Sequence, residues 1–255
     1  MPKLFIIAGP NGAGKSTSAP ELLIGPRRVD EFVNADVIAK EEGLSDIAAG
    51  RQTLQRLDEL AHARRDIAFE TTLSSRLLLG RIRLMCARGY VCQLSFFWLP
   101  SADMAVERVA RRVAAGGHSI PEDVIRRRYE RGLQNFFVDY LAAVDSWVMI
   151  NNAIAPPDNR IAWRDVGQRT VVADNRLWNQ LASRYMKPRV EQPVATSESP
   201  LTDADVKAAF DSEDILRAVN RAVTAALRRH KALGQSVVIW RDGKIVELTP
   251  EEIDV

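Results

Sequence analysis

Cysteine is rare in this chain of 255 residues: only Cys86 and Cys92 occur, with no CxxC pattern and no Cys/His spacing typical of metal sites. We therefore expect both to be reduced, structural residues. Long apolar runs are also missing, because none approaches the roughly 20 residues that cross a bilayer. The N-terminal apolar stretch is too short for a signal peptide. Together these absences predict a cytoplasmic protein.

A large excess of one charge is absent as well. The formal net charge is +2, with 46% hydrophobic and 27% charged residues. This balance argues against a nucleic-acid or membrane partner, since both require a strongly basic surface. It is typical of an ordinary enzyme that acts on a small molecule.

The most informative segment follows the first apolar stretch, Leu4 to Ala8. Residues 9–17 read GPNGAGKST and match the phosphate-binding (Walker A) pattern G-x-x-x-x-G-K-[ST] at every fixed position. The glycines let successive backbone N–H groups approach a phosphate, and the following helix directs its positive end to the same anion. We expect Lys15 to reach the outer phosphates and Ser16 to bind Mg²⁺. The predicted ATP-binding residues are Asn11, Gly12, Ala13, Gly14, Lys15, Ser16 and Thr17.

Strand-like and helix-like segments alternate along the chain, which predicts an α/β fold of the P-loop NTPase type, with a parallel sheet of about five strands flanked by helices. The predicted strands are 4–8, 32–34, 67–70, 91–99 and 147–151, and a hairpin at the sheet edge is expected from 161–166 and 170–173. The predicted helices are 15–23, 53–65, 75–88, 102–114, 121–137 and 176–185.

A carboxylate follows the second predicted strand in the sequence Asn34-Ala35-Asp36. The carboxyl ends of parallel strands are where α/β sheets bind ligands. We therefore expect Asn34 and Asp36 to contact the phosphoryl acceptor, with Asp36 as its general base. The alternative is that Asp36 is only a helix N-cap.

The third predicted strand ends in Glu70-Thr71-Thr72 at the same edge. Glu70 is expected to bind substrate hydroxyls or to hold the metal through water, and Thr71 and Thr72 to hydrogen-bond the acceptor. For each hydroxyl, a local capping role is an equally good interpretation.

Seven arginines against three acidic residues lie between Arg108 and Arg131. A helix break at Gly116-Gly117-His118 divides this region, which predicts an arginine-rich helical lid over about 102–137. Guanidinium groups on a lid can clamp phosphates and neutralise transition-state charge. Arg108, Arg112 and Arg128 are the predicted phosphate-binding lid residues, and the other arginines are expected to be solvated or paired with acids.

A second compositional region begins near residue 187. Prolines and serines predict a linker, and beyond it a long amphipathic helix is followed by two short strands around Asp242-Gly243, a strong hairpin signal. The predicted organisation is a kinase domain over 1–186, a linker over 187–200 and a small α+β module over 201–255, with its helix at 213–233 and strands at 236–240 and 244–248.

Taken together, GPNGAGKST, VNADVIA, FETTLSS and ERVARRVAAGGHSIPEDVIRRRYERGL resemble the zeta-toxin family of P-loop kinases over roughly residues 3–152. That resemblance implies the toxic half of a bacterial toxin–antitoxin pair, which phosphorylates the 3′-hydroxyl of UDP-N-acetylglucosamine with ATP and Mg²⁺. It implies that Lys15 is the P-loop lysine, Asp36 the catalytic aspartate and Glu70 the substrate-binding glutamate. The C-terminal module resembles short bacterial proteins encoded beside such kinases, which implies an antitoxin-like segment.

Two other interpretations remain open. One is a P-loop kinase for another small hydroxyl compound, such as an antibiotic or a nucleotide, and the other is a non-catalytic nucleotide-binding interaction protein. An ABC-type ATPase is disfavoured because the chain lacks an LSGGQ-like signature.

Overall fold

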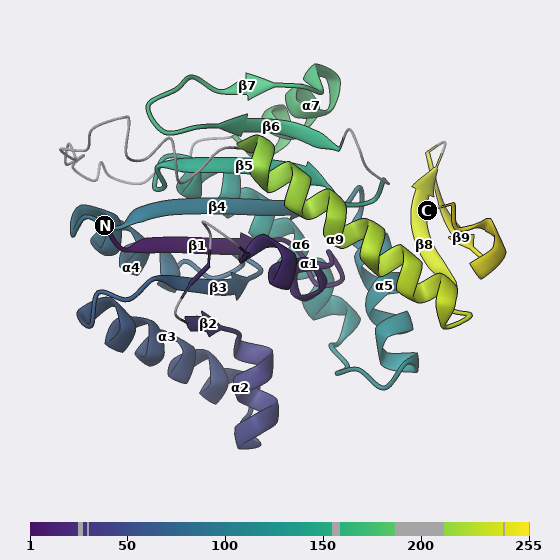
Figure 1. Ribbon diagram of the computed structural model, residues 1–255, viewed down its shortest axis with the longest axis horizontal. Helices are drawn as coiled ribbons and strands as arrows, with labels where there is room; N and C mark the ends of the chain where they lie inside the picture. The colour runs from purple at the N-terminus through teal and green to yellow at the C-terminus, as the bar shows by residue number, and fades with distance from the viewer. Residues whose placement is uncertain (25–27, 30, 155–158, 187–211, 242, 255) are drawn as a thin grey trace.

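The computed structural model describes residues 1–24, 28–29, 31–154, 159–186, 212–241 and 243–254 (Figure 1). The predicted linker at 187–200 lies outside the described residues, as does Asp242 of the predicted hairpin turn.

A seven-stranded sheet in the order β2-β3-β1-β4-β5-β6-β7 forms the centre of the molecule (Figure 1). Its first five strands are parallel, and β6 and β7 add antiparallel pairs at one edge. This confirms the predicted α/β class and the expected edge hairpin. The strands are β1 (Lys3–Ala8), β2 (Glu31–Val33), β3 (Ile67–Thr71), β4 (Val91–Trp98), β5 (Ser146–Asn151), β6 (Arg160–Arg164) and β7 (Val171–Val172).

Helices cover both faces of the sheet. On one face lies α1 (Lys15–Leu22), and α9 (Ser212–Ala232) packs beside it, as Figure 1 shows in front of the sheet. On the other face, the Phe96 ring of β4 lies 4.5 Å from the Phe136 ring. Phe136 begins η2 (Phe136–Tyr140), a π-helical extension of α6 (Glu122–Asn135). Further helices of the body are α4 (Leu77–Ala87), α5 (Ala102–Ala114) and α7 (Asn175–Tyr185).

Between β2 and β3 the structure departs from the predicted secondary structure. The helix expected from Thr53 begins at Asp46 and runs to His62 as α3, with Ser45 accepting a hydrogen bond from Ala48 N at 3.4 Å. A further helix, α2 (Ala35–Glu42), precedes it and ends at Gly43. Serine is a good N-cap, so this signal was available, but Gly50 inside the helix weakens the helical pattern of its first turns.

The expectation that both cysteines are reduced is wrong, because Cys86 and Cys92 form a disulfide. Cys86 lies in the last turn of α4 and Cys92 near the start of β4, and Gly89, at φ +81°, allows the tight turn between them. That turn brings the two Cα atoms to 6.1 Å, within the usual range for a disulfide. The sequence spacing alone did not reveal this proximity.

The C-terminal segment ends in a hairpin of β8 (Val237–Arg241) and β9 (Lys244–Leu248), followed by the short helix η3 (Pro250–Glu252). Arg241 pairs with Lys244, which confirms the predicted two-residue connection. Val219 of α9 and Val238 of β8 belong to the same buried cluster as Leu4 and Ile6 of the central sheet. The C-terminal segment therefore shares the core of the central sheet.

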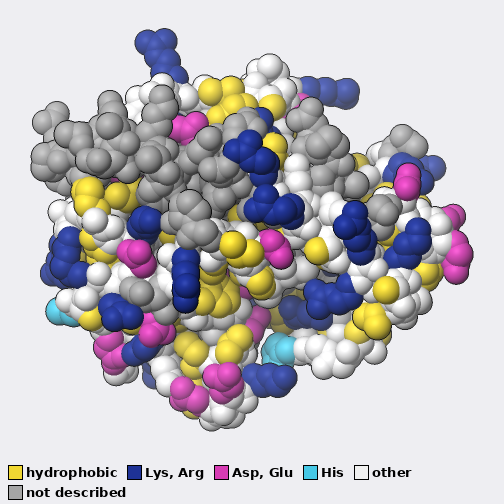
Figure 2. Space-filling model, in the orientation of Figure 1, with side chains coloured by type: hydrophobic (Ala, Val, Ile, Leu, Met, Phe, Trp, Pro, Cys, Tyr) yellow, Lys and Arg dark blue, Asp and Glu magenta, His cyan; other side chains and the backbone are white. Residues whose placement is uncertain are grey.

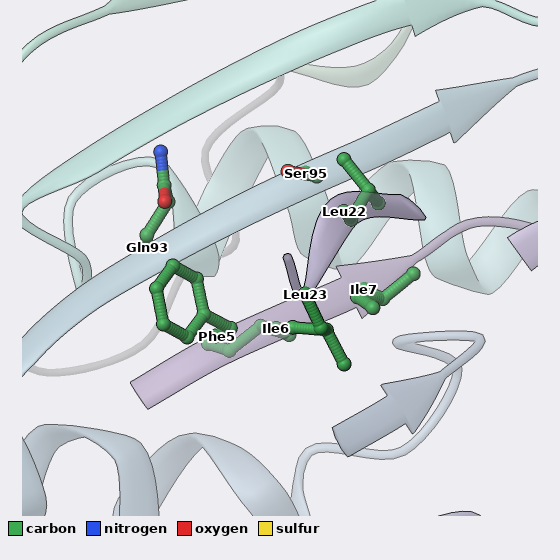
Figure 3. A pocket seen from close by; sticks show the side chains of 7 residues that line it. All are labelled: Phe5, Ile6, Ile7, Leu22, Leu23, Gln93 and Ser95. Atoms are coloured by element: carbon green, nitrogen blue, oxygen red, sulfur yellow. The ribbon is translucent and has the colours of Figure 1, made fainter. Parts of the chain in front are cut away.

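A small pocket lies under α1, away from the carboxyl ends of the strands (Figure 3). It is lined by Phe5, Ile6, Ile7, Leu22, Leu23, Gln93 and Ser95. Because these residues come from the middle of the strands and the end of α1, the pocket is separate from the glycine-rich loop.

The surface that carries α9 shows Lys and Arg side chains interspersed with acidic ones (Figure 2), in keeping with the small net charge. Among the described helices, none combines the length and the apolar character that crossing a membrane requires.

Candidate active site

Lys15 sits at the centre of the site, at the start of α1. Its Nζ donates to Pro10 O at 3.0 Å and lies 3.6 Å from Glu70 Oε1. Burial lowers the pKa of Lys15, the carboxylates of Glu70 and Asp36 oppose that shift, and the Arg112 guanidinium adds to it. Thus Asp36, Glu70 and Arg112 all lie close enough to Lys15 to act on its charge.

Two glycines allow neighbouring elements to approach the loop. A Cβ on Gly12, whose φ is +75°, would lie 2.9 Å from Ala105 O and 3.0 Å from the Cβ of Arg108, so α5 packs directly on the loop. A Cβ on Gly14, with φ +79°, would lie 2.7 Å from the amide nitrogen of Asn152. Larger residues at either position would force these neighbours away.

Glu70 connects the loop to the second strand. Its Oε2 accepts hydrogen bonds from Ser16 Oγ at 2.7 Å and from Asn34 Nδ2 at 2.9 Å. The sequence predicted Glu70 and Ser16 to lie at one edge of the sheet, and they are in direct contact.

Asn34, rather than Asp36, caps the helix that follows β2. Asn34 is the N-cap of α2, because its Oδ1 accepts from Asp36 N at 2.8 Å and Val37 N at 3.4 Å. The alternative that Asp36 is the N-cap is therefore wrong: it lies in the first turn with an exposed side chain. The Asn34 side chain thus bonds both the start of α2 and Glu70.

Thr71 and Thr72 shape the turn after β3. Leu73 N donates to Thr71 Oγ1 at 3.1 Å, and Thr72 Oγ1 lies 2.8 Å from Ser74 Oγ. These bonds accompany a left-handed conformation at Leu73, whose φ is +55°. Neither threonine caps α4, whose N-cap residue is Arg76.

The three predicted lid arginines lie in different surroundings. Arg112 is exposed and donates from Nη2 to His118 O at 3.0 Å. Arg108 donates from Nη2 to Val238 O of β8 at 3.0 Å, and burial lowers its pKa to about 10. Arg128 is half-buried on α6. Of the remaining lid arginines, Arg126 pairs with Glu122 and Asp103, and Arg127 with Asp123.

Asn152 is a site residue that the sequence reasoning missed. It follows β5, and its Nδ2 donates to Ala13 O at 2.7 Å, which ties the end of the fifth strand to the glycine-rich loop. The signal was present, since Asn152 follows a buried strand at the same sheet edge as Asp36 and Glu70.

Comparison with known proteins supports a common architecture. No protein-family model matches the chain. An uncharacterised protein of Haemophilus influenzae is 26% identical over 133 residues, which is 50% of this chain and 92% of that protein. Among solved structures, AvrRxo1-ORF1:-ORF2 with ATP is similar at a TM-score of 0.54 and 15% identity, covering 88% of this chain and 76% of that one.

A weaker likeness, at a TM-score of 0.46 and 15% identity, is to a structure from the PezAT toxin–antitoxin system of Streptococcus pneumoniae, over 59% of this chain and 68% of that one. The strand order decides the class, because β1 carries the glycine-rich loop and lies between β3 and β4. The chain has a P-loop kinase fold. In this P-loop kinase fold, Asp36, Glu70 and the loop share the carboxyl edge of the sheet, where ligands bind.

Proposed function

We propose that this chain is an ATP-dependent kinase that transfers the γ-phosphate to a hydroxyl group of a small molecule, with a sugar nucleotide such as UDP-N-acetylglucosamine as the first candidate acceptor. The observation that carries the proposal is the contact of Lys15 Nζ with Glu70 Oε1 at 3.6 Å, in a site where the charges of Asp36 and Arg112 also act on the pKa of Lys15. It joins a phosphate-binding cation, an acceptor-side carboxylate and a second cation in one site.

Nucleotide binding rests on the glycine-rich loop. Backbone N–H groups of the loop and the start of α1 form an anion cradle. In the proposed enzyme Lys15 is the cation for the outer phosphates, and Arg112 would neutralise charge that develops on the transferred group. ATP is also present in the AvrRxo1-ORF1:-ORF2 structure that shares this fold.

The oxygen atoms around Ser16 fit a magnesium ion. Ser16 Oγ and Glu70 Oε2 are 2.7 Å apart, and hard cations such as Mg²⁺ take oxygen ligands. In the proposed enzyme Ser16 holds the ion directly and Glu70 holds it through water. The bound ion would neutralise charge on the phosphates.

Asp36 is the proposed general base. Its side chain is exposed at the first turn of α2, and its charge acts on Lys15. An acceptor hydroxyl placed between Asp36 and the nucleotide would give its proton to the carboxylate as its oxygen attacks phosphorus and the bond to the leaving diphosphate breaks. Thr71 and Thr72 would then act by fixing the turn beside the acceptor. Control by an antitoxin protein or by the chain's own C-terminal segment is part of the proposal.

The decisive experiment incubates the protein with labelled ATP, Mg²⁺ and a panel of sugar nucleotides, nucleotides and antibiotics. Lys15→Ala should lose ATP binding. Asp36→Asn should bind ATP but lower the transfer rate by about 10² to 10⁴, the usual contribution of a positioned general base. Lys40→Ala, an exposed change in the last turn of α2, is the matched control and should retain activity.

The same experiment can also contradict the proposed function. Phosphorylation of an antibiotic or a nucleotide instead would replace the acceptor class. ATP binding without transfer to any compound would favour a nucleotide-binding interaction protein. Near-normal turnover in Asp36→Asn would remove Asp36 as the base.

A further inference from the structure

The β8–β9 hairpin docks on the kinase body through the free edge of β8. Val238 O accepts from Arg108 Nη2 at 3.0 Å, and Trp240 N donates to Ala153 O at 3.0 Å. Residues two apart in a strand direct their backbone groups to the same edge, so both contacts use the edge that is not paired with β9. The hairpin is thus held by hydrogen bonds of the kind that join strands.

Both elements beneath this edge also touch the glycine-rich loop. The Cβ of Arg108 closely approaches Gly12, and Asn152, which precedes Ala153, donates to Ala13 O. The hairpin therefore bridges from α5 to the segment after β5, across two elements that flank the loop. Figure 1 shows the hairpin beside the end of α5.

Polar groups in this region lack the partners that their chemistry favours. Arg108 is half-buried, and within the described residues its guanidinium donates to the backbone oxygen of Val238 and forms no ion pair. Within the described part of the chain, Asn11 Oδ1 and Asn152 Oδ1 are buried without a hydrogen-bond partner. Buried polar groups are normally satisfied, so this arrangement is suited to a ligand that carries both anionic and hydrogen-bonding groups, as a nucleotide does.

The side-chain bonds between the hairpin and α5 are partly exposed, unlike the contacts that anchor α9. Arg111 bonds Ser236 at 3.1 Å and Glu247 at 2.7 Å through partly exposed groups. Exposed ion pairs of this kind add little binding energy. By contrast, α9 is anchored by the buried side chains of Val219 and Ala222. Lifting the hairpin would expose the buried side chains of Val238 and Leu248, while Val219 and Ala222 of α9 would stay buried.

We propose that the β8–β9 hairpin is a displaceable cover on the nucleotide side of the glycine-rich loop, which competes with ATP for Arg108. This inference rests on the proposed function, because it requires that the loop binds ATP. Docking of the hairpin and full engagement of ATP exclude each other. The hairpin thereby sets the apparent ATP affinity of the kinase.

The test uses the full chain, because removing the C-terminal segment would also remove α9 from the core. Glu247→Gln breaks the ion pair with Arg111, and Glu247→Lys adds repulsion. ATP affinity is measured by calorimetric titration. We expect Glu247→Gln to bind ATP about two- to fivefold more tightly than wild type, because that factor corresponds to the free energy of one exposed ion pair. Glu247→Lys should bind ATP more tightly still. Asp103→Asn is the control. Asp103 lies on α5, like Arg111, but its 2.6 Å ion pair is with Arg126 and does not involve the hairpin.

Hydrogen exchange of the wild-type chain gives an independent measurement. Saturating ATP should accelerate exchange of the amides of β8 and β9. Two results would contradict the proposal that the hairpin covers the ATP site. One is hydrogen exchange of the hairpin that stays the same or slows when ATP binds, and the other is an ATP affinity of Glu247→Lys that is unchanged or weaker. Either result would favour a hairpin that forms part of the ATP site. Loss of ATP binding in every variant, with Lys15→Ala indistinguishable from wild type, would instead refute the proposed function itself.

Discussion

Glu70 is the residue through which the parts of the site meet, since it contacts Ser16, Asn34 and Lys15. A single carboxylate in this position can orient a metal ligand and balance the P-loop cation. Its loss should therefore affect the metal more than the fold.

We predict that Glu70→Gln raises the Mg²⁺ concentration needed for half-maximal turnover by about 10- to 100-fold, the usual effect of losing a group that orients a metal ligand. Activity measured over a magnesium titration checks this. Glu59→Gln, a change to an exposed carboxylate that pairs with Arg56, should leave the titration unchanged. A normal magnesium requirement combined with weaker acceptor binding would instead assign Glu70 to the acceptor.

Single residues were predictable where one local pattern fixes their place. Lys15 and Ser16 follow from the loop pattern, and Glu70 follows from its position at the end of a strand. Asn152 also follows a strand, but the partners that Asn152 and Arg108 contact are not encoded locally in the sequence. The Asn152 bond to Ala13 spans 139 residues, and the Arg108 bond to Val238 spans 130. Such contacts depend on how distant segments pack against one another, and the spacing of residues within one segment does not predict that packing.

At the level of elements, the helices with clear caps and the strands with continuous apolar character were predictable. Ser101 caps α5, which runs over the predicted residues, and β4 is buried along its whole length. The succession of two helices, α2 and then α3, was harder to predict. The reason is that α2 is short and has no buried side chain to mark its inward face. Amphipathic periodicity cannot identify a helix whose faces are both exposed or half-buried.

The contact between α5 and the hairpin has a predictable pH dependence. The Arg111 guanidinium and the Ser236 hydroxyl hold the pKa of Glu247 at about 2, below its usual 4.5. A lowered carboxyl pKa adds stability that is complete above the unfolded pKa and is lost as the pH falls toward the folded one. We predict that wild type melts at a higher temperature than Glu247→Gln at about pH 6 and that this difference shrinks by about pH 3. A difference that is constant over this range would show that the ion pair does not form in solution.

For the molecule as a whole, the important feature is that α9 shares the core of the sheet. The predicted division into a body at 1–186 and a module at 201–255 stays a prediction, but the side chain of Val219 is fully buried in the central cluster. The C-terminal segment therefore contributes to the stability of the body that carries the glycine-rich loop.

We predict that Val219→Ala lowers the free energy of unfolding by about 2 kcal/mol, from lost burial and the cavity that remains. For a chain of this size, the melting temperature should fall by about 4–8 °C. Leu233→Ala, just beyond the end of α9 and 62% exposed, is the control and should change little. Thermal melts of both variants make the comparison. Equal melting temperatures for Val219→Ala and wild type would mean that α9 does not pack on the body in solution.

The late position of α9 in the chain also affects biosynthesis. A ribosome completes β1, β4 and β5 well before it reaches residues 212–232, which shield one face of those strands in the finished protein. During translation the phosphate-binding loop therefore lies on a sheet that still exposes part of its apolar face, which chaperones can bind. The face of the sheet that α9 covers is therefore closed only after residues 212–232 have been made, so the scaffold that carries the glycine-rich loop is completed late in folding.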